Sequence, residues 1–455
     1  MVNAQQSYGV WLALVLCLLV ISAANMTQAF LPGYMSLVII SALPLAGLVL
    51  VKYSFVMVFL FVGFSFFRLH EAFSQLYHFK IPLLLSLAAL LGLGWQLLIS
   101  RQIKCYWRAE MSWLLAFYLV VMVGIVLASN RPIALAYFNN IYWKIILMSF
   151  AIAWLMQRKQ DFSSAIFIIV GFGTAIACVA IYNQVNAIGL VEGTRVTIGR
   201  QLGSVLGDPN DLALVLMFPM AFACAIAFHP KVTPFLRLGL CGCVILLSVA
   251  IIATQSRGGL LGILAIFSLF FYFKCPSKTL FLTVFTLLAP VLFVIAGISD
   301  RASGGAAEAG IDASAMGRLY AWQAAWGMAL DNPLSGVGLN NFYANYYFYS
   351  PHWDGLNHAV HSTWFGILAE TGFLGLLIFT GLMLKLIRCG QYNLSALRNT
   401  QHTVPLVIDI SCRAVFVALI ATVISATFLT QGFTWPIYVL AAMVIALRQW
   451  IDKHL

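Results

Sequence analysis

The chain has 455 residues, of which 62% are hydrophobic and only 9% charged, and its formal net charge is +11. This composition excludes a series of soluble domains and predicts an all-α polytopic membrane protein, folded as a single integral membrane domain over residues 1–455. In a soluble protein such a positive charge would indicate nucleic acid. Here it has to be divided between the two sides of a bilayer, and we expect no nucleic-acid partner.

Apolar runs long enough to cross about 30 Å of hydrocarbon as a helix, roughly 17–25 residues each, recur along the chain. The first run lacks the basic segment and the cleavage site of a signal peptide, so we interpret it as a span. One run is short and follows its neighbour almost without a turn, so the sequence predicts twelve to fourteen transmembrane helices. The candidate spans are Tyr8–Asn25, Tyr34–Val51, Ser54–Phe67, Ile81–Ile99, Met111–Ala128, Leu135–Met156, Ser164–Tyr182, Asp211–Phe228, Phe235–Thr254, Gly258–Phe273, Thr279–Ile298, Thr363–Leu386, Ser411–Thr430 and Thr434–Trp450.

Lys and Arg are unevenly divided between the two sides that alternate loops would face. With a cytoplasmic N-terminus, one side receives sixteen of these cations and the other eight, while Lys144 lies inside a span. Because cytoplasmic loops are enriched in Lys and Arg, we expect both termini in the cytoplasm. Seven of the eight outward cations are Arg, whose planar fork grips phosphate or carboxylate in two bonds, so an anionic ligand is indicated on that side.

Residues 299–362 form the longest segment that is too polar for a membrane, and the alternation places it on the outward side. A loop of this length inside an apolar protein is functional or disordered, and its many Tyr, Trp, Arg and His residues favour function. Within it, Gly317–Leu330 has apolar residues at helical spacing, which predicts an amphipathic helix in the outer membrane interface with Arg318 in its first turn. The following NFYANYYFYSPHW suits either the interface or the faces of sugar rings.

Two short outward segments carry further Arg residues. GTRVTIGRQLGSVLGDPND contains Arg195 and Arg200, and its Pro209 predicts a helix start capped by Asp208 or Asn210. The glycines would let a ligand approach the backbone, although a capped helix beside an exposed Arg explains the same pattern. In TQSRGGLLG, Arg257 stands at the outer end of a span. Such a charge indicates either a functional residue or an Arg that reaches the lipid head groups.

The loop ends in NHAVHSTWFGILAETGFLGLL, which enters the next span. His361 at the mouth of that span is placed to take a proton from a hydroxyl near neutral pH, although a structural His is the alternative. His358 lies three residues earlier, but no outward Cys or nearby carboxylate completes a zinc site with this pair. Asp208 and Asp211 are explained better as capping residues than as a metal pair, so we expect no metal and no cofactor. All nine cysteines lie in spans or inward loops, which leaves no outward disulfide or thiol nucleophile.

The ordered set of motifs resembles the O-antigen ligase and O-antigen polymerase superfamily. Arg200-x-x-Gly is followed by DPND, then SRGG with Arg257, GRLYAW, NPLSGVGLNNF and HSTWFGILAETGFLGLL, and the likeness covers Gly193–Leu386. The N-terminal FFRLHEAF is similar to the branch of O-glycosylation ligases from exosortase-associated clusters.

The resemblance implies an inverting, metal-independent glycosyl transfer at the outer, periplasmic face of the bacterial inner membrane. The donor would be a glycan on undecaprenyl diphosphate. The family's catalytic His aligns with His361, which would act as base on the acceptor hydroxyl. Arg200, Arg257 and Arg318 would clamp the diphosphate and stabilise the charge that develops on it. Candidate supporting residues are Arg195, His358 and Glu370, the last of which either orients a partner or pairs within the bundle.

The acceptor stays open at this stage. A ligase passes the glycan to lipid A–core, a polymerase to a lipid-linked repeat unit, and a protein O-oligosaccharyltransferase to Ser or Thr, all through a hydroxyl. Membrane lipids and other polysaccharide-assembly proteins are further expected partners. Two alternatives belong to other functional classes: an anion transporter that uses the outward Arg residues, and a non-catalytic scaffold. Against transport, the sequence has no inverted repeat and few ionisable residues within spans.

Overall fold

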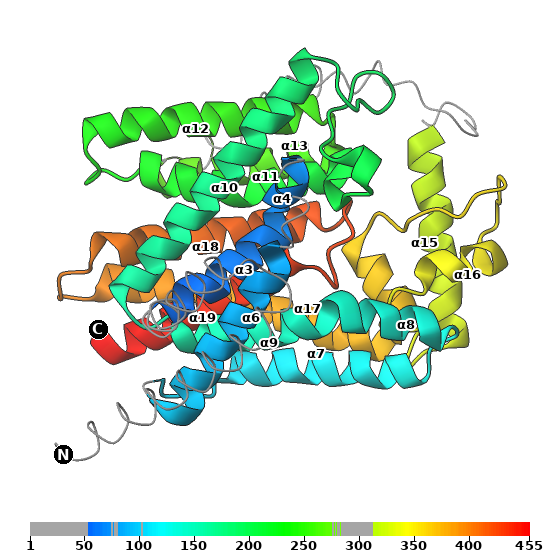
Figure 1. Cartoon of the computed structure of the whole chain (residues 1–455), viewed down its shortest axis with the longest axis horizontal. Coiled ribbons are helices and arrows are strands. Elements are labelled where there is room, and N and C mark those ends of the chain that lie inside the picture. The colour runs from blue at the N-terminus through cyan, green and yellow to red at the C-terminus, as the bar shows by residue number, and fades with distance from the viewer. Residues whose placement is uncertain are drawn as a thin grey trace, which may run out of the picture. The chain divides into compact units, whose positions relative to one another are not determined.

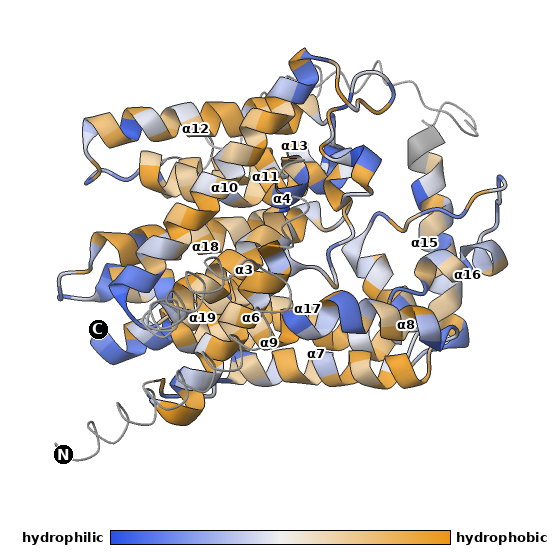
Figure 2. Ribbon diagram, viewed as in Figure 1, coloured by the Kyte–Doolittle hydropathy of each residue, from blue (hydrophilic) through white to orange (hydrophobic). Residues whose placement is uncertain are grey.

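The computed structural model of the chain describes residues 53–73, 76, 81–101, 103–274, 277, 279, 283 and 313–455. Regular structure in these ranges is helical (Figure 1), apart from one isolated antiparallel bridge between Val191 and Arg195. Among the described residues, nine helical segments are long and apolar enough to cross a bilayer, and Figure 2 shows apolar residues along most of them. The prediction of an all-α polytopic membrane protein is thereby confirmed.

The nine candidate spans follow the predicted runs closely. They are α6 with η1 (Ile81–Ile99), α7 (Ala109–Val126), α8 to α9 (Arg131–Leu155), α10 (Lys159–Val185), α11 (Pro209–Ala227), α12 (Pro234–Ala253), α13 (Arg257–Lys274), α17 (Thr363–Asn399) and α18 (Leu406–Ser425). Two further apolar helices are the short α3 (Ser54–Phe67) and α19 (Trp435–His454). The predicted spans Tyr8–Asn25 and Tyr34–Val51, and nearly all of Thr279–Ile298, lie outside the described residues, so the total of twelve to fourteen stays a prediction.

The chain divides into two compact units, one of residues 1–61 and 80–105, the other of residues 62–79 and 106–455. The first unit contains α6, and the second contains every described candidate site residue. The expectation of one integral membrane domain stays a prediction.

Helix α11 forms the core of the second unit. Nearly all of its side chains are buried, and it contacts α10, α12, α13 and α18. A helix that is apolar all round is stable when protein surrounds it, as here. Its internal Pro219 fits against Gly173 of α10, where an added Cβ would overlap the proline ring. The segment that begins at Pro209 is therefore held firmly in place.

Two boundaries differ from the sequence prediction. Helix α17 continues to Asn399, so most of the predicted inward loop Arg388–Ile410 is helical. Its last turns bury Cys389 and Asn393, and the Asn393 amide donates a hydrogen bond to the Val444 carbonyl. A search for uniformly apolar runs misses such a helix, which is apolar on one face only. Helix α18 was predicted as Ser411–Thr430 and instead ends at Ser425, which leaves residues 426–434 as an irregular connection.

The predicted helix Gly317–Leu330 is confirmed as α15 (Ala313–Asp331). Its buried face, however, consists of the small residues Ala321, Ala324 and Ala325 with Met328, which pack in one cluster with residues of α16 (Phe342–Tyr349) and α17. The larger apolar residues whose spacing predicted the amphipathic helix are exposed: Leu319, Trp326 and Leu330. The small side chains let α15 approach closely, and its placement in a membrane interface stays a prediction.

The connections that carry the sequence motifs meet at one end of the second unit, next to α15 and α16 (Figure 1). Backbone hydrogen bonds join these connections in pairs: Val196 N to Ala253 O, Thr363 N to Ala426 O and Ser129 N to Val337 O. At the opposite end, the His229 ring lies 2.9 Å from the Asp409 carboxylate, which ties the end of α11 to the start of α18. The outward and inward loops of the sequence prediction thus lie at opposite ends of this unit.

Candidate functional site

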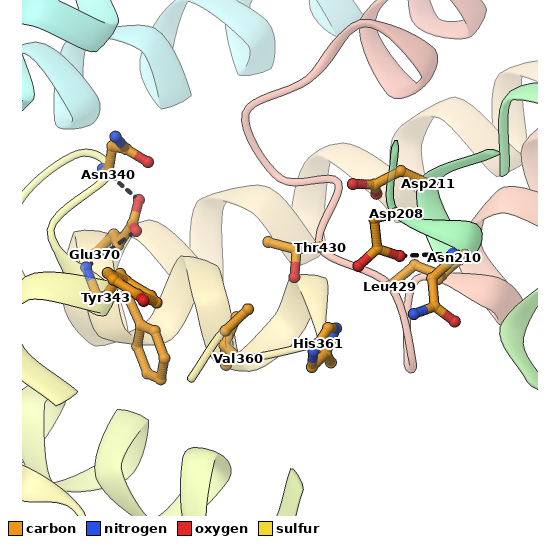
Figure 3. A pocket seen from close by; sticks show the side chains of 12 residues that line it. Asp208, Asn210, Asp211, Asn340, Tyr343, Val360, His361, Glu370, Leu429 and Thr430 are labelled. Atoms are coloured by element: carbon orange, nitrogen blue, oxygen red, sulfur yellow. Dashed lines mark hydrogen bonds between the residues drawn. The ribbon is translucent and has the colours of Figure 1, made fainter. Parts of the chain in front are cut away.

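A cavity of about 270 Å³ lies where these connections meet. It is lined by four segments of the second unit: the start of α11, the start of α16 with the loop before it, the segment before α17 together with α17 itself, and the connection after α18. Figure 3 shows His361 between two polar groups, with Asn340, Tyr343 and Glu370 on one side and Asp208, Asn210 and Asp211 on the other. The lining residues are Asp208, Asn210, Asp211, Asn340, Phe342, Tyr343, Ala359, Val360, His361, Glu370, Leu429 and Thr430.

His361 is held in an unusual backbone conformation, with φ at +44°. A non-glycine residue at positive φ is uncommon and persists where its surroundings fix it. The Trp322 indole of α15 donates a hydrogen bond of 3.1 Å to the carbonyl of Val360, and its ring stacks on Phe365 at 5.0 Å. Helix α15 therefore fixes the residue before His361 and the first turn after it.

The electrostatics around His361 favour a neutral imidazole. Burial lowers the pKa of His361 below its ordinary value, and the Asp208 carboxylate opposes this shift. The positive charges of Arg318 and Arg195, together with His358, lower the pKa further. A neutral imidazole can accept a proton, so the side chain is ready to act as a base.

Thr363 ties the segment after His361 to the irregular connection after α18. Its backbone N–H donates to the carbonyl of Ala426 at 2.8 Å, and its hydroxyl donates to the carbonyl of Leu429 at 2.6 Å. The same hydroxyl accepts a hydrogen bond from the N–H of Gln431. Leu429 and Thr430 are thereby presented to the cavity, and sequence reasoning missed them because the predicted span Ser411–Thr430 contained them.

Asn210 joins two of the sequence motifs. Its side-chain oxygen accepts hydrogen bonds from Arg195 Nη2 at 3.3 Å and from the Ser256 hydroxyl at 2.9 Å. The guanidinium of Arg195 is buried, and its Nε also donates to the carbonyl of Thr254. The motifs GTRV, DPND and SRGG therefore meet around one buried amide.

Asp208 caps α11, as predicted, because its carboxylate accepts the N–H of Asn210 at 2.6 Å. Asp211, one turn on, lies 3.5 Å from the Gln431 side-chain amide. Both carboxylates also line the cavity. Sequence reasoning treated them only as capping residues, although two carboxylates one turn apart at the start of a span are themselves a signal of a functional site.

The predicted Arg residues occupy different positions. Arg318 of α15 is buried, and its guanidinium lies 5.7 Å from the centre of the Phe428 ring, next to the connection that lines the cavity. Arg257 is the first residue of α13, directly after the Ser256 that binds Asn210. Arg200 is exposed in the 3₁₀ turn η3 (Arg200–Leu202), with its backbone beside Gly207. Of these three, Arg318 is the one whose charge lowers the pKa of His361.

Glu370 is a cavity residue with a clear structural partner. Its carboxylate accepts the N–H groups of Asn340 at 2.7 Å and Phe342 at 3.3 Å, so it binds the N-terminus of α16. His358 instead lies 3.0 Å from both carboxylate oxygens of Asp354, at an exposed position. Glu370 therefore lies in the cavity, whereas His358 lies at the surface.

Helix α17 changes direction at Gly372, which has φ at +68°. The break frees the carbonyl groups of Ala369 and Glu370 to accept the N–H groups of Val337 and Gly338. The motifs SGVGL and ETGF therefore interlock through the backbone, and Glu370 is brought to the cavity by this contact.

Comparison with known protein families gives a match for part of this region. Residues 242–380 match the family model described as O-antigen ligase. The match confirms the resemblance to the O-antigen ligase and polymerase superfamily and implies glycosyltransferase activity of that type, with a lipid-linked glycan donor and an acceptor in a membrane. It covers less than half of the chain, and it includes SRGG, α15, α16 and His361 but not Arg195, Arg200 or Asp208. A comparison with curated proteins gives no significant match.

Proposed function

We propose that this O-antigen ligase family member is an inverting, metal-independent glycosyltransferase. It moves a glycan from undecaprenyl diphosphate to an acceptor hydroxyl at the periplasmic face of the bacterial inner membrane, with both termini in the cytoplasm. The observation that carries the proposal is the cavity in which His361, with a lowered pKa, lies beside carboxylates and near buried guanidinium groups. The family match over residues 242–380 supports the same reaction type.

In this reaction His361 is the base. The acceptor oxygen attacks the anomeric carbon of the donor from the face opposite the diphosphate, and the hydroxyl proton passes to the His361 imidazole. The bond between the anomeric carbon and the diphosphate oxygen breaks, and its electron pair leaves with the diphosphate. The configuration at carbon is inverted because one displacement occurs. General base catalysis of this kind contributes typically about 10²–10⁴-fold in rate.

The diphosphate would be held by Arg residues at the Asn210 end of the cavity. Arg195 and Arg318 are buried close enough to affect the pKa of His361, while Arg257 begins α13 beside the Asn210 network. Arg200, at an exposed position, would meet the lipid head group as it enters. Guanidinium groups in these positions would stabilise the negative charge that develops on the leaving group.

The test is transfer by the purified protein in lipid nanodiscs. The donor is a glycan-bearing undecaprenyl diphosphate, and the acceptors are lipid A–core, a second lipid-linked repeat unit and a peptide rich in Ser and Thr. We expect transfer to one acceptor, and a loss of about 10²-fold or more in His361→Asn. Asn tolerates positive φ better than most residues, so this variant removes the base while keeping the backbone conformation.

His402→Ala, an exposed substitution between α17 and α18 at the opposite end of the unit, is the matched control and should transfer at the wild-type rate. Wild-type transfer by His361→Asn would remove His361 as the base. Absence of transfer to all three acceptors by the wild-type protein would refute the proposed function.

A further inference from the structure

Helix α16 has two aromatic faces with different surroundings. Phe342 and Tyr346 are buried, with 4% and 1% of their surface exposed, and they pack against α15 in the same cluster. Tyr343 and Tyr347, also four residues apart, are 57% and 53% exposed. Residues at this spacing share a helix face, so one face anchors the helix and the other presents tyrosine rings.

The exposed rings continue beyond the helix. The Tyr347 ring lies 5.2 Å from Phe348 and 4.8 Å from Trp353, both in edge-to-face geometry. Phe348 and Trp353 are 74% and 48% exposed. We call Tyr343, Tyr347, Phe348 and Trp353 the aromatic platform. Large exposed apolar groups that lie together mark a surface that a ligand or the membrane covers, because folding alone does not stabilise them.

The aromatic platform is joined to the cavity and is held in place. Tyr343 lines the cavity itself, on the side of His361 occupied by Glu370 (Figure 3). Glu370 accepts the N–H of Phe342 at the first turn of α16, and the buried Tyr346 fixes the helix one turn later. The platform therefore begins at the cavity wall, and its position relative to His361 is set by buried contacts.

We propose that the aromatic platform binds the pyranose rings of a saccharide acceptor. This inference rests on the proposed function and narrows it, since a saccharide acceptor excludes Ser and Thr of a protein. In a single inverting displacement the incoming hydroxyl lies opposite the leaving diphosphate. With the diphosphate at the Arg195 and Asn210 end, the acceptor enters from the other side of His361, which is the side of Tyr343 and Glu370.

The chemistry of the surface favours sugar over lipid. The C–H groups on one face of a pyranose carry small positive charges, which the negative face of an aromatic ring attracts. Next to Trp353, the Asp354 carboxylate and the His358 ring lie 3.0 Å apart, and both side chains are about 40% exposed. A carboxylate in hydrocarbon would be costly, whereas sugar hydroxyl groups donate hydrogen bonds to it.

Direct binding tests the proposal without requiring transfer. Chitotetraose, cellotetraose, maltotetraose and laminaritetraose are titrated onto the protein in nanodiscs, with ligand-observed NMR as the readout. We expect millimolar binding of at least one of these saccharides by the wild-type protein. The double variant Tyr347→Ala with Trp353→Ala should bind about tenfold more weakly, since each ring face contributes roughly threefold or more.

Controls separate a lost binding surface from a lost fold. Trp353→Phe keeps a flat ring and should bind within about twofold of wild type, and Tyr182→Ala removes an equally exposed tyrosine on α10 and should bind as wild type. The double variant should also keep the wild-type melting temperature. Absence of binding by the wild type to all four saccharides, or unchanged binding by the double variant, would overturn the inference while the transfer assay still decides the proposed function.

A last experiment tests whether the aromatic platform lies in the bilayer instead of binding a saccharide. Brominated lipids in the nanodisc quench tryptophan fluorescence at short range. If the quenched fraction drops in Trp353→Phe, Trp353 lies within the lipid and the saccharide assignment is wrong. We expect the quenched fraction to be equal or slightly higher in Trp353→Phe, because removing a Trp outside the lipid lowers only the unquenched signal.

Discussion

The Trp322 indole donates its hydrogen bond to the carbonyl of Val360, the residue that precedes His361. Because His361 has a positive φ, small shifts of the preceding peptide would reorient its imidazole. Helix α15, none of whose described residues lines the cavity, therefore sets the direction of the proposed base.

Trp322→Phe tests this contact. The substitution keeps an aromatic ring to stack on Phe365, and it removes the N–H donor together with part of the indole ring system. A buried carbonyl that loses its donor costs about 1–3 kcal/mol locally, and we expect transfer to fall roughly tenfold as Val360 and His361 shift. Transfer rates and the melting temperature are measured together. Trp326→Phe, at an exposed position on the same helix, should change neither, and a wild-type rate for Trp322→Phe would show that the bond does not position His361.

The acid limb of the pH–rate profile should report the pKa of His361. Burial and the nearby Arg318 lower this pKa, so the unprotonated base persists below the ordinary pKa of His, and kcat/KM falls only as pH decreases further. Asp208 opposes the shift, so Asp208→Asn should move the limb to lower pH, whereas Arg318→Gln should move it to higher pH. His358 and Arg195 are unchanged in both variants. Shifts in the same direction for both would contradict the assignment of the limb to His361.

Asn210 is expected to be essential for the fold of the site. Asn210→Leu leaves Arg195 Nη2 and the Ser256 hydroxyl without their shared acceptor in a buried place, which should lower the free energy of unfolding by about 1–3 kcal/mol. Thermal unfolding in detergent measures the change. Asn186→Ala, which removes an exposed amide bonded to the Tyr182 carbonyl, should cost far less. An equal decrease in the free energy of unfolding for the two variants would show that the hydrogen bonds to Asn210 stabilise the protein no more than an exposed one does.

The spans and several motif positions could be predicted from sequence, because apolar run length and helix-start residues are local properties. Pro209 and Asp208 start α11 as expected, and α15 lies where its spacing predicted a helix. The buried face of α15 was not predictable in the same way. Its alanines pack because α17 approaches closely, and that approach depends on residues far away in the chain.

The site itself was predicted only in part. His361 and Glu370 do line one cavity, yet the role of Glu370 at the start of α16 depends on the break in α17 at Gly372, which no local pattern reveals. Asp208 and Asp211 were assigned to capping alone, because their approach to the same cavity as His361 involves segments that are about 150 residues apart. The roles given to Arg200, Arg257 and Arg318 stay predictions.

Gly372 should be intolerant of any side chain. Its φ of +68° is costly for other residues, and an added Cβ would lie 2.4 Å from the carbonyl oxygen of Pro333. Gly372→Ala should therefore lower the free energy of unfolding by at least about 2 kcal/mol and shift Glu370 away from the cavity, with loss of transfer. Thermal unfolding and the transfer assay measure the two effects.

Gly239→Ala is the control, because this exposed glycine of α12 has open space around it. Its replacement should be neutral or stabilising by up to about 1 kcal/mol. A Gly372→Ala protein as stable and active as Gly239→Ala would show that the break in α17 does not position the cavity wall.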